Sequence, residues 1–244
     1  MNTNIALVLV LAPFLGFLIN VFFGKSLGKS LSGIIGTLSV LVSFIATAYF
    51  FGGIAAQPEG IRISLFDWIQ ISNFNVDFGF QLDQLSILWL LFVTGIGSLI
   101  HLYSISYMHD DENMHKFFAY LNLFIFFMIT LVIGSNLLVL FIGWEGVGLC
   151  SYLLIGFWHK NQEYNDAAKK AFIMNRIGDL GLLVGIFILG NLFSTLDYAT
   201  LKTAIAGATN LDMYWLSVAA FALFIGACGK SAQIPLYTWL PDAM

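Results

Sequence analysis

Four ionisable side chains lie inside long apolar runs of this sequence: Glu145, Arg176, Asp179 and Lys230. A charged side chain at the centre of a membrane helix costs about 2.5–3.5 kcal/mol on insertion scales, so four without partners would cost roughly 12 kcal/mol. A cost of that size is comparable to the whole stability of a typical domain. We therefore expect these side chains to pair with one another or to contact water within the membrane.

Lys230 has the sequence surroundings of a proton-binding group. Pro235 has no N–H, so the carbonyl of Ser231 loses its intrahelical donor, and Gly229 loosens the same stretch further. In a bilayer such a break persists only where protein or a water-filled cavity satisfies the backbone, and transporters build ion sites at broken helices. Burial disfavours the ammonium form of a lysine and a nearby carboxylate favours it, so movement of Glu145 relative to Lys230 would change its proton affinity. The alternative is a lysine whose side chain extends to the membrane surface.

Glycines surround Glu145 in the sequence. Gly143, Gly146 and Gly148 remove side-chain bulk from the helix surface around the carboxylate. The space they leave admits either water or a closely packed neighbouring helix. The structural alternative is a packing face that carries a polar bystander, but the cost of a charge in the membrane favours a functional glutamate.

Arg176 and Asp179 are three positions apart, which places them on one face of a helix, where they can form an ion pair. The pair either opens and closes during proton transfer or is a permanent structural pair. Lys170, near the end of the same apolar run, either supplies protons to an inner entrance or only marks the topology of the chain.

The rest of the chain is strongly apolar. Of its 244 residues 59% are hydrophobic and 10% are charged, with a mean hydropathy of +0.87. Soluble domains carry roughly 25% charged residues. Seven apolar runs have the length that crosses a bilayer, and they cover residues 5–23, 31–51, 84–107, 117–133, 136–158, 168–193 and 213–240. The sequence therefore predicts an all-α membrane protein with about seven transmembrane helices, the seventh broken near Pro235.

Two connectors have patterns of their own. Residues 69–72 and 76–82 alternate between apolar and polar side chains on either side of an asparagine-rich turn, which predicts a β-hairpin outside the bilayer, between helices 2 and 3. Residues 195–211 carry Leu196, Leu201 and Ile205 at near-helical spacing, which predicts a short amphipathic helix at the membrane interface.

The lysine and arginine distribution predicts that the N-terminus faces the periplasm or its equivalent. With that orientation six basic residues lie in inner loops and two in outer loops. The inner ones are Lys25, Lys29, Lys116, Lys160, Lys169 and Lys170, and the outer ones are Arg62 and Lys202. The first apolar run has no positively charged segment before it, so we interpret it as a retained span and not a signal peptide.

Several functional classes are disfavoured by composition. The net charge of −4 and the scattered basic residues do not indicate a nucleic-acid partner. Cys150 and Cys228 have no C-x-x-C spacing, so we expect buried thiols and no metal, haem or iron–sulfur site. The aromatic residues near the ends of the runs are expected to anchor the helices at the interface; they are Trp68, Tyr107, Trp158, Tyr214, Trp215 and Trp239.

Three motifs together resemble a known family. The run GWEGVGLCSYLLIGFW at residues 143–158 is similar to the fifth-helix signature of the largest antiporter-like subunit of respiratory complex I, subunit L of the bacterial NADH–quinone oxidoreductase or chain 5 of the mitochondrial enzyme. KAF at 170–172 with RIGD at 176–179 resembles its sixth helix, and GKSAQIPL at 229–236 with WLPDAM at 239–244 resembles its broken seventh. The three motifs occur in the family's order, and the resemblance extends over essentially the whole chain.

The resemblance implies a proton-translocating role for named residues. Glu145 would modulate Lys230, the central lysine on the discontinuous helix, and Arg176 with Asp179 would form a gating ion pair. It implies an enzyme-complex subunit with no cofactor of its own, whose flavin and iron–sulfur clusters belong to partner subunits. The implied partners are other membrane subunits of complex I, especially the neighbouring antiporter-like subunit, together with lipid and protons.

The family normally continues beyond Met244 into further helices. We therefore expect residues 1–53 to form the first two helices, 54–83 the external hairpin, and 84–244 helices 3–7 at the beginning of the first antiporter-like repeat. A multi-subunit Na⁺/H⁺ antiporter and a membrane-bound hydrogenase complex use related subunits and are the alternatives. The expected location is the bacterial inner membrane, with the mitochondrial inner membrane as the alternative.

Overall fold

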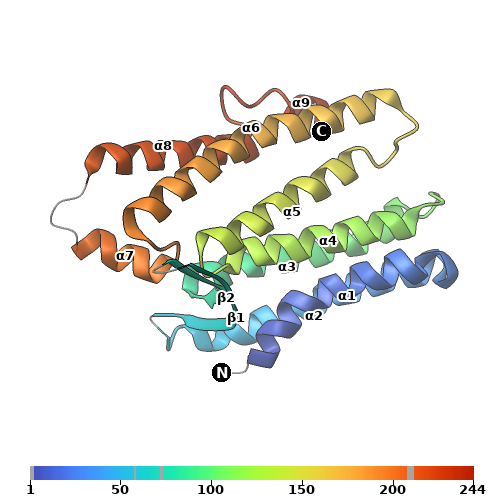
Figure 1. Cartoon of the computed structure of the whole chain (residues 1–244). Helices are drawn as coiled ribbons and strands as arrows, with labels where there is room; N and C mark the ends of the chain where they lie inside the picture. Colours follow the sequence, from blue (N-terminus) through green and yellow to red (C-terminus); the bar gives the residue numbers. More distant parts are fainter. Residues whose placement is uncertain (1–2, 58, 72–73, 208–211) are drawn as a thin grey trace. The chain divides into compact units, whose positions relative to one another are not determined.

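The computed structural model describes residues 3–57, 59–71, 74–207 and 212–244. These residues form nine α-helices and two strands (Figure 1). The long helices are α1 (Thr3–Leu27), α2 (Lys29–Ile54), α3 (Gln84–Tyr107), α4 (Met114–Ile133), α5 (Leu137–Ile155), α6 (Gln162–Phe193) and α8 (Met213–Lys230). All seven are long and apolar enough to cross a membrane, which confirms the predicted all-α membrane fold.

Two helix ends differ by six residues or more from the ends of the apolar runs in the sequence. Helix α6 begins at Gln162 instead of 168, because Asn161 caps it: its side-chain oxygen accepts a hydrogen bond from the Glu163 N–H at 3.0 Å. The polar first turns of α6 are helical although they are not apolar. Helix α8 ends at Lys230 instead of continuing to 240.

The chain divides into two compact units. The first comprises Met1–Ile63, Phe80–Gly134 and Ile142–Cys150, and its centre is the bundle of α1–α4. Small residues bring these helices together: a Cβ at Gly33 would lie 2.9 Å from Ile105 on α3, and one at Gly36 would lie 2.7 Å from Phe118 on α4. Hydrogen bonds add to this packing, as in the 2.7 Å bond from the Ser43 hydroxyl on α2 to the Leu9 carbonyl on α1.

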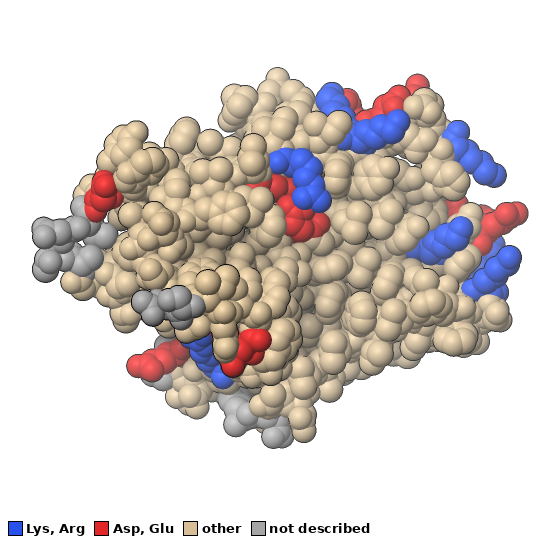
Figure 2. Space-filling view, in the orientation of Figure 1, with Lys and Arg blue, Asp and Glu red and all other residues tan. Residues whose placement is uncertain are grey.

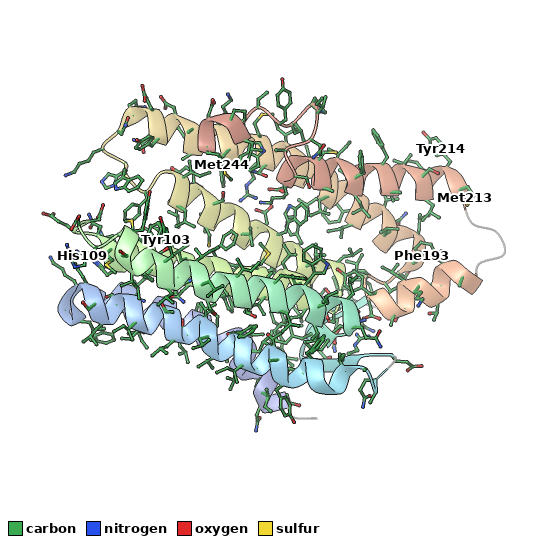
Figure 3. The ribbon with its side chains drawn as sticks, turned by 180° about the vertical axis from the view of Figure 1, so that it is seen from behind. Tyr103, His109, Phe193, Met213, Tyr214 and Met244 are labelled. Carbon is green, nitrogen blue, oxygen red and sulfur yellow. The ribbon has the colours of Figure 1, made fainter. Side chains whose placement is uncertain are left out.

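The second unit comprises Ser64–Gly79, Ser135–Phe141 and Ser151–Met244. Its main contact is the packing of α6 against α8, and the short C-terminal helix α9 (Leu240–Ala243) also contacts α6. Figure 3 shows Phe193 at the end of α6 and Met213 at the start of α8. Between them lies α7 (Tyr198–Gly207), which confirms the short helix predicted for this connector; Leu201 is its buried side chain. Residues 208–211 of the predicted segment lie outside the described residues.

The predicted hairpin is present between α2 and α3. Strand β1 (Ile61–Ile71) pairs with β2 (Phe74–Leu82), and β1 begins earlier than the alternating pattern had indicated. The predicted turn at Ser72 and Asn73 lies outside the described residues. The ring of Phe78 stacks on Phe66 across the two strands, with centroids 5.3 Å apart.

Asn136 joins the hairpin to the start of α5. Its side-chain oxygen accepts hydrogen bonds from the N–H groups of Leu138 and Val139 at 3.1 and 3.0 Å, which caps the helix. Its amide nitrogen donates to the Asp77 carbonyl of β2 at 2.7 Å. One side chain therefore satisfies backbone groups of two elements.

We predict that Asn136→Ala destabilises the full-length protein by about 1–2 kcal/mol, the usual cost of a lost N-cap. Thermal unfolding in detergent would measure the change. Asn136→Ser is the matched control, because a serine hydroxyl can still accept from the first N–H groups of α5, while the bonds of the amide to the Asp77 carbonyl and the Ser135 hydroxyl are lost. Equal destabilisation by the two variants would contradict a capping role.

Large apolar side chains cover much of the outer surface. On α3 they include Leu85, Trp89, Leu99 and Tyr103, each more than half exposed. In the face shown in Figure 2, charged side chains are few and are separated by wide uncharged areas. A soluble monomer rarely exposes so much contiguous apolar surface, so these faces suit contact with lipid or membrane partners.

The aromatic residues predicted to lie at the interface have different environments. Trp68, Tyr107, Trp158, Tyr214 and Trp215 are exposed. Trp239 is buried, with 8% of its surface exposed, so its predicted anchoring role was wrong. Its indole N–H instead donates a hydrogen bond to the Gly229 carbonyl, at the break after α8.

Candidate functional site

Lys230 is the last residue of α8, at the break that the sequence predicts. After it the chain is non-helical until α9. Two carbonyls at the break accept hydrogen bonds from side chains: the Trp239 indole N–H donates to Gly229 at 3.1 Å, and the Gln233 side-chain amide donates to Ser231 at 3.1 Å. Satisfied carbonyls are what a break at membrane depth requires.

Glycines bring α6 and α8 into backbone contact beside Lys230. A Cβ at Gly178 would lie 3.0 Å from the Cα of Gly229, the residue directly before Lys230. The contact continues along both helices, since a Cβ at Gly181 would lie 3.0 Å from the Ala222 carbonyl and one at Gly185 would lie 3.0 Å from the Ala219 carbonyl. The glycines on α6 therefore have the close-packing role expected from the sequence.

Asp179 and Lys230 both directly follow the glycines of this contact. Asp179 is buried, with 4% of its surface exposed, and Lys230 is half-buried. One of the backbone contacts of α6 with α8 thus occurs at the positions directly before a carboxylate and an ammonium. In an environment of low polarity, the free energy of a charged side chain depends strongly on the charges beside it.

Arg176 lies one turn before Asp179 on α6. Its guanidinium carbon is 4.8 Å from the centre of the Phe172 ring, within the range of a cation–π contact. Arg176 is exposed, unlike Asp179. The gating ion pair between the two stays a prediction.

Lys170 forms an ion pair with Asp242 of α9 at 2.5 Å. Both side chains are nearly half exposed, at 43% and 49%. Asp242 was not singled out from the sequence, although its position in the first turn of a helix after Pro241 is a common one for an acidic residue. Lys170 therefore links α6 to the segment that follows the helix break.

We predict a small coupling energy for this pair, below about 1 kcal/mol, because both partners are exposed. A double-mutant cycle of Lys170→Glu and Asp242→Lys, read by thermal unfolding of the full-length protein, measures it, and the double variant should recover part of the loss. Lys169→Glu is the matched control, because Lys169 pairs with Asp166 at 3.5 Å and should not respond to Asp242→Lys. If Lys169→Glu and Asp242→Lys show the same coupling energy as Lys170→Glu and Asp242→Lys, the Lys170–Asp242 ion pair is contradicted.

Glu145 lies on α5, where glycines bring α5 against α4. A Cβ at Gly143 would lie 2.6 Å from the Cα of Leu131, and a Cβ at Gly146 would overlap the ring of Phe127. The carboxylate of Glu145 is half-buried. These glycines have the packing role that the sequence left as one of two alternatives. Arg176, Asp179, Lys230 and Lys170 belong to the second unit, and Glu145 belongs to the first.

Metal-ligating residues do not cluster in the described part of the chain, where no group of three or more His, Cys, Asp or Glu side chains could hold a metal ion. Cys150 and Cys228 are free and buried, as predicted for structural thiols.

Two family models match the chain. Residues 134–244 match the transmembrane region of the NADH:quinone oxidoreductase/Mrp antiporter family, and residues 68–118 match the N-terminus of chain 5 of NADH–ubiquinone oxidoreductase (complex I). The first match contains every predicted site residue. The second contains most of the hairpin and α3.

Curated relatives match nearly the whole chain. NADH-quinone oxidoreductase subunit L of Campylobacter jejuni is 47% identical over 99% of the chain, and that of Pseudomonas aeruginosa is 45% identical over 96%. NADH-ubiquinone oxidoreductase chain 5 of Triticum aestivum is 43% identical over 98%. The chain spans 36–39% of the length of these relatives.

Two solved structures have the same fold. One is the membrane-bound sulfane sulfur reductase, an archaeal respiratory membrane complex, with a TM-score of 0.84 and 20% identity over 99% of this chain and 47% of that one. The other is the Mrp complex from Dietzia sp. DQ12-45-1b, with a TM-score of 0.83 and 24% identity over 99% of this chain and 25% of that one. At these identities the likeness concerns the fold alone. Taken with the family models and the curated relatives, the chain belongs to the family of antiporter-like membrane subunits that includes subunit L and chain 5 of NADH–quinone oxidoreductases, and it corresponds to their N-terminal part.

Proposed function

We propose that this chain is the N-terminal part of a proton-translocating membrane subunit of an NADH–quinone oxidoreductase. The observation that carries the proposal is the placement of Lys230 at a helix break, directly after the backbone contact of Gly229 with Gly178, the residue that precedes buried Asp179 on the facing helix. The names of the relatives that match over nearly the whole chain support it.

Lys230 is the group that takes up and releases the proton. In a site of low polarity its ammonium is stabilised by a carboxylate and destabilised when that carboxylate is neutralised or withdrawn. Asp179 and Glu145 supply the carboxylates, and Arg176 competes with Lys230 for Asp179 as the gating partner. Lys170, in the third turn of α6, relays protons to the site. Glycines bring the neighbouring helices close to these charges.

The chain acts within a larger complex. We propose that it packs against other membrane subunits, in particular a neighbouring antiporter-like subunit, in a bacterial inner membrane. The flavin and iron–sulfur clusters that drive quinone reduction reside in partner subunits. This chain has no redox centre of its own, and its part in the reaction is the change of charge at its lysine and carboxylate side chains. Its exposed apolar faces suit contact with lipid and with these subunits.

A role in a Na⁺/H⁺ antiporter is the second candidate, because the matching family model includes Mrp antiporters and the Mrp complex shares the fold. The curated relatives favour the oxidoreductase. They are 41–47% identical to this chain, compared with 24% for the Mrp chain.

Purification of the tagged full-length protein from its native membrane separates the two candidates. We expect flavin- and iron–sulfur-containing subunits to co-purify and to support NADH-driven quinone reduction. Recovery of only small membrane subunits, with Na⁺-dependent proton exchange in vesicles, would overturn the oxidoreductase assignment in favour of the antiporter.

A further inference from the structure

The α1–α4 bundle contains buried polar side chains that the proposed proton site does not use. Asn20 on α1, His101 on α3 and Asn122 on α4 are at most 1% exposed, and we call them the polar layer. Within the described part of the chain, four of their atoms have no hydrogen-bond partner: Nδ2 and Oδ1 of Asn20, Nε2 of His101 and Oδ1 of Asn122. Each such atom costs about 1–3 kcal/mol if it stays dry.

Asn20 lies on the face of α1 that packs against α2 and α4. The glycines one turn before and after it contact both helices: Gly16 contacts Ser39 and Asn122, and Gly24 contacts Ser32 and His115. Residues four apart share a helix face, so Asn20 lies between these two sets of contacts. The residues of α2 and α4 that lie at the same depth as Asn20 are Gly36 and Phe118, which contact each other.

His101 reaches the same level from α3. Its ring centroid is 6.1 Å from that of Phe118. The contacts one turn before and one turn after His101 place it at the same depth. Gly97 contacts Val40 on α2 and Ile125 on α4, and Ile105 contacts Gly33 on α2. The three residues of the polar layer therefore lie at one depth of the bundle, the depth of Gly36.

The hydrogen bond of His101 defines its tautomer. Nδ1 is 2.7 Å from the Gly97 carbonyl oxygen, which can only accept, so Nδ1 carries the hydrogen. In the neutral ring Nε2 then has a lone pair and accepts. Binding of one proton at Nε2 converts the ring to an imidazolium, and the hydrogen on Nδ1 keeps its bond to the Gly97 carbonyl.

Asn122 has satisfied donors and an unsatisfied acceptor. Its amide nitrogen donates to the Gly36 carbonyl at 3.0 Å and to the Ser39 hydroxyl at 2.7 Å, while Oδ1 lies beside Gly36 without a hydrogen-bond partner among the described residues. Asn20 supplies one donor and one acceptor without partners among the described residues. Buried water typically makes two to four hydrogen bonds to groups of this kind.

We propose that the polar layer binds internal water and that Nε2 of His101 is a proton acceptor within it. The ligand is water, with a proton held at the imidazole. The proposal concerns the α1–α4 bundle alone and does not depend on the proposed function, because hydration and the tautomer follow from the packing of these four helices.

Other titratable groups on the packed helices lie at other levels or faces. They are Lys25 on α1, Lys29 and Tyr49 on α2, Tyr103 and Tyr107 on α3, and His115, Lys116 and Tyr120 on α4. Tyr120 is at the level of the layer, but it is two residues from both Phe118 and Asn122 and so lies on another face of α4. His115 lies one turn away, at the level of Gly24. Tyr103, two residues after His101, is exposed on the outer face of α3 (Figure 3). His101 is thus the titratable group of the layer itself.

A cryo-EM map of the full-length protein in its complex, at a resolution that shows ordered water, tests the hydration. We expect water peaks within hydrogen-bond distance of the Asn20 amide and of His101 Nε2, and loss of the first peak in Asn20→Leu. Ser43→Ala is the matched control, because the Ser43 hydroxyl is buried and already bonded to Leu9, so the peaks should remain. A map without water at either position would overturn the proposal.

Nitrogen NMR of the full-length protein, labelled at histidine and embedded in a bilayer, tests the proton acceptor. We expect His101 to show a hydrogen on Nδ1 and none on Nε2 at high pH, and to gain one at Nε2 as the pH falls. Exposed His109 serves as the internal reference, and His101→Gln assigns the signal. If that variant does not fold, replacement of His109, His115, His159 and every histidine outside residues 1–244 leaves His101 as the remaining signal. A ring that keeps Nε2 unprotonated throughout the pH range in which the protein is folded would overturn the assignment.

Discussion

Lys230→Met in the full-length protein should lower the rate of proton transfer through this subunit by on the order of 10²–10⁴-fold, the range found when a positioned proton donor or acceptor is removed. Methionine keeps most of the volume and removes the group that binds the proton. Lys230 lies at the end of α8, where the helix breaks and where glycines bring α6 into contact, so no other lysine is placed to replace it among the described residues. The measurement is the number of protons translocated per quinone reduced by the complex in proteoliposomes.

Lys230→Arg distinguishes a proton carrier from a fixed charge. Arginine keeps the positive charge but does not release its proton at any accessible pH. We expect Lys230→Arg to be as defective as Lys230→Met, and Glu145→Gln to be impaired as well. Lys202→Ala, on the exposed side of α7, is the matched control and should pump normally. Normal pumping by both Lys230→Met and Glu145→Gln would overturn the site.

Gly143→Ala should destabilise the protein by about 1–3 kcal/mol and impair pumping without removing any charge. The new methyl group would lie 2.6 Å from the Cα of Leu131 on α4. A side chain at that position could rotate away, but the backbone of α4 cannot, so α5 must shift. Because Glu145 is two residues further along α5, the shift displaces the carboxylate. Thermal unfolding and the pumping ratio of the same preparation measure the two effects.

Gly52→Ala provides the control for the substitution itself. Gly52 is also in a long helix, α2, but a Cβ there would meet nothing within 4 Å. We expect unchanged or slightly higher stability, because alanine favours the helix over glycine by roughly 1 kcal/mol. If the two variants lose stability equally, the close contact of α5 with α4 is not the cause.

Local rules of the sequence were sufficient for the type and order of the elements. Apolar runs of membrane length are independent of what they pack against, so the seven helices could be located from composition alone. Pro235 removes a donor from its own helix, so the break after Lys230 could also be predicted locally. The glycines beside Glu145 and Asp179 indicated close packing, because small residues admit another backbone wherever it comes from.

The partners of these residues depend on segments far apart in the sequence, and only the tertiary structure decided them. Gly178 meets Gly229, Lys170 meets Asp242, and Trp239 donates to Gly229 instead of anchoring at the interface. His101 and Asn20 were hidden in apolar runs, where a single polar residue gives no sign of its neighbours. The sequence by itself determined which segments cross the membrane and where the seventh breaks. The tertiary structure decided which side chains face one another, because helix register follows from side-chain packing between helices and not from the pattern within one of them.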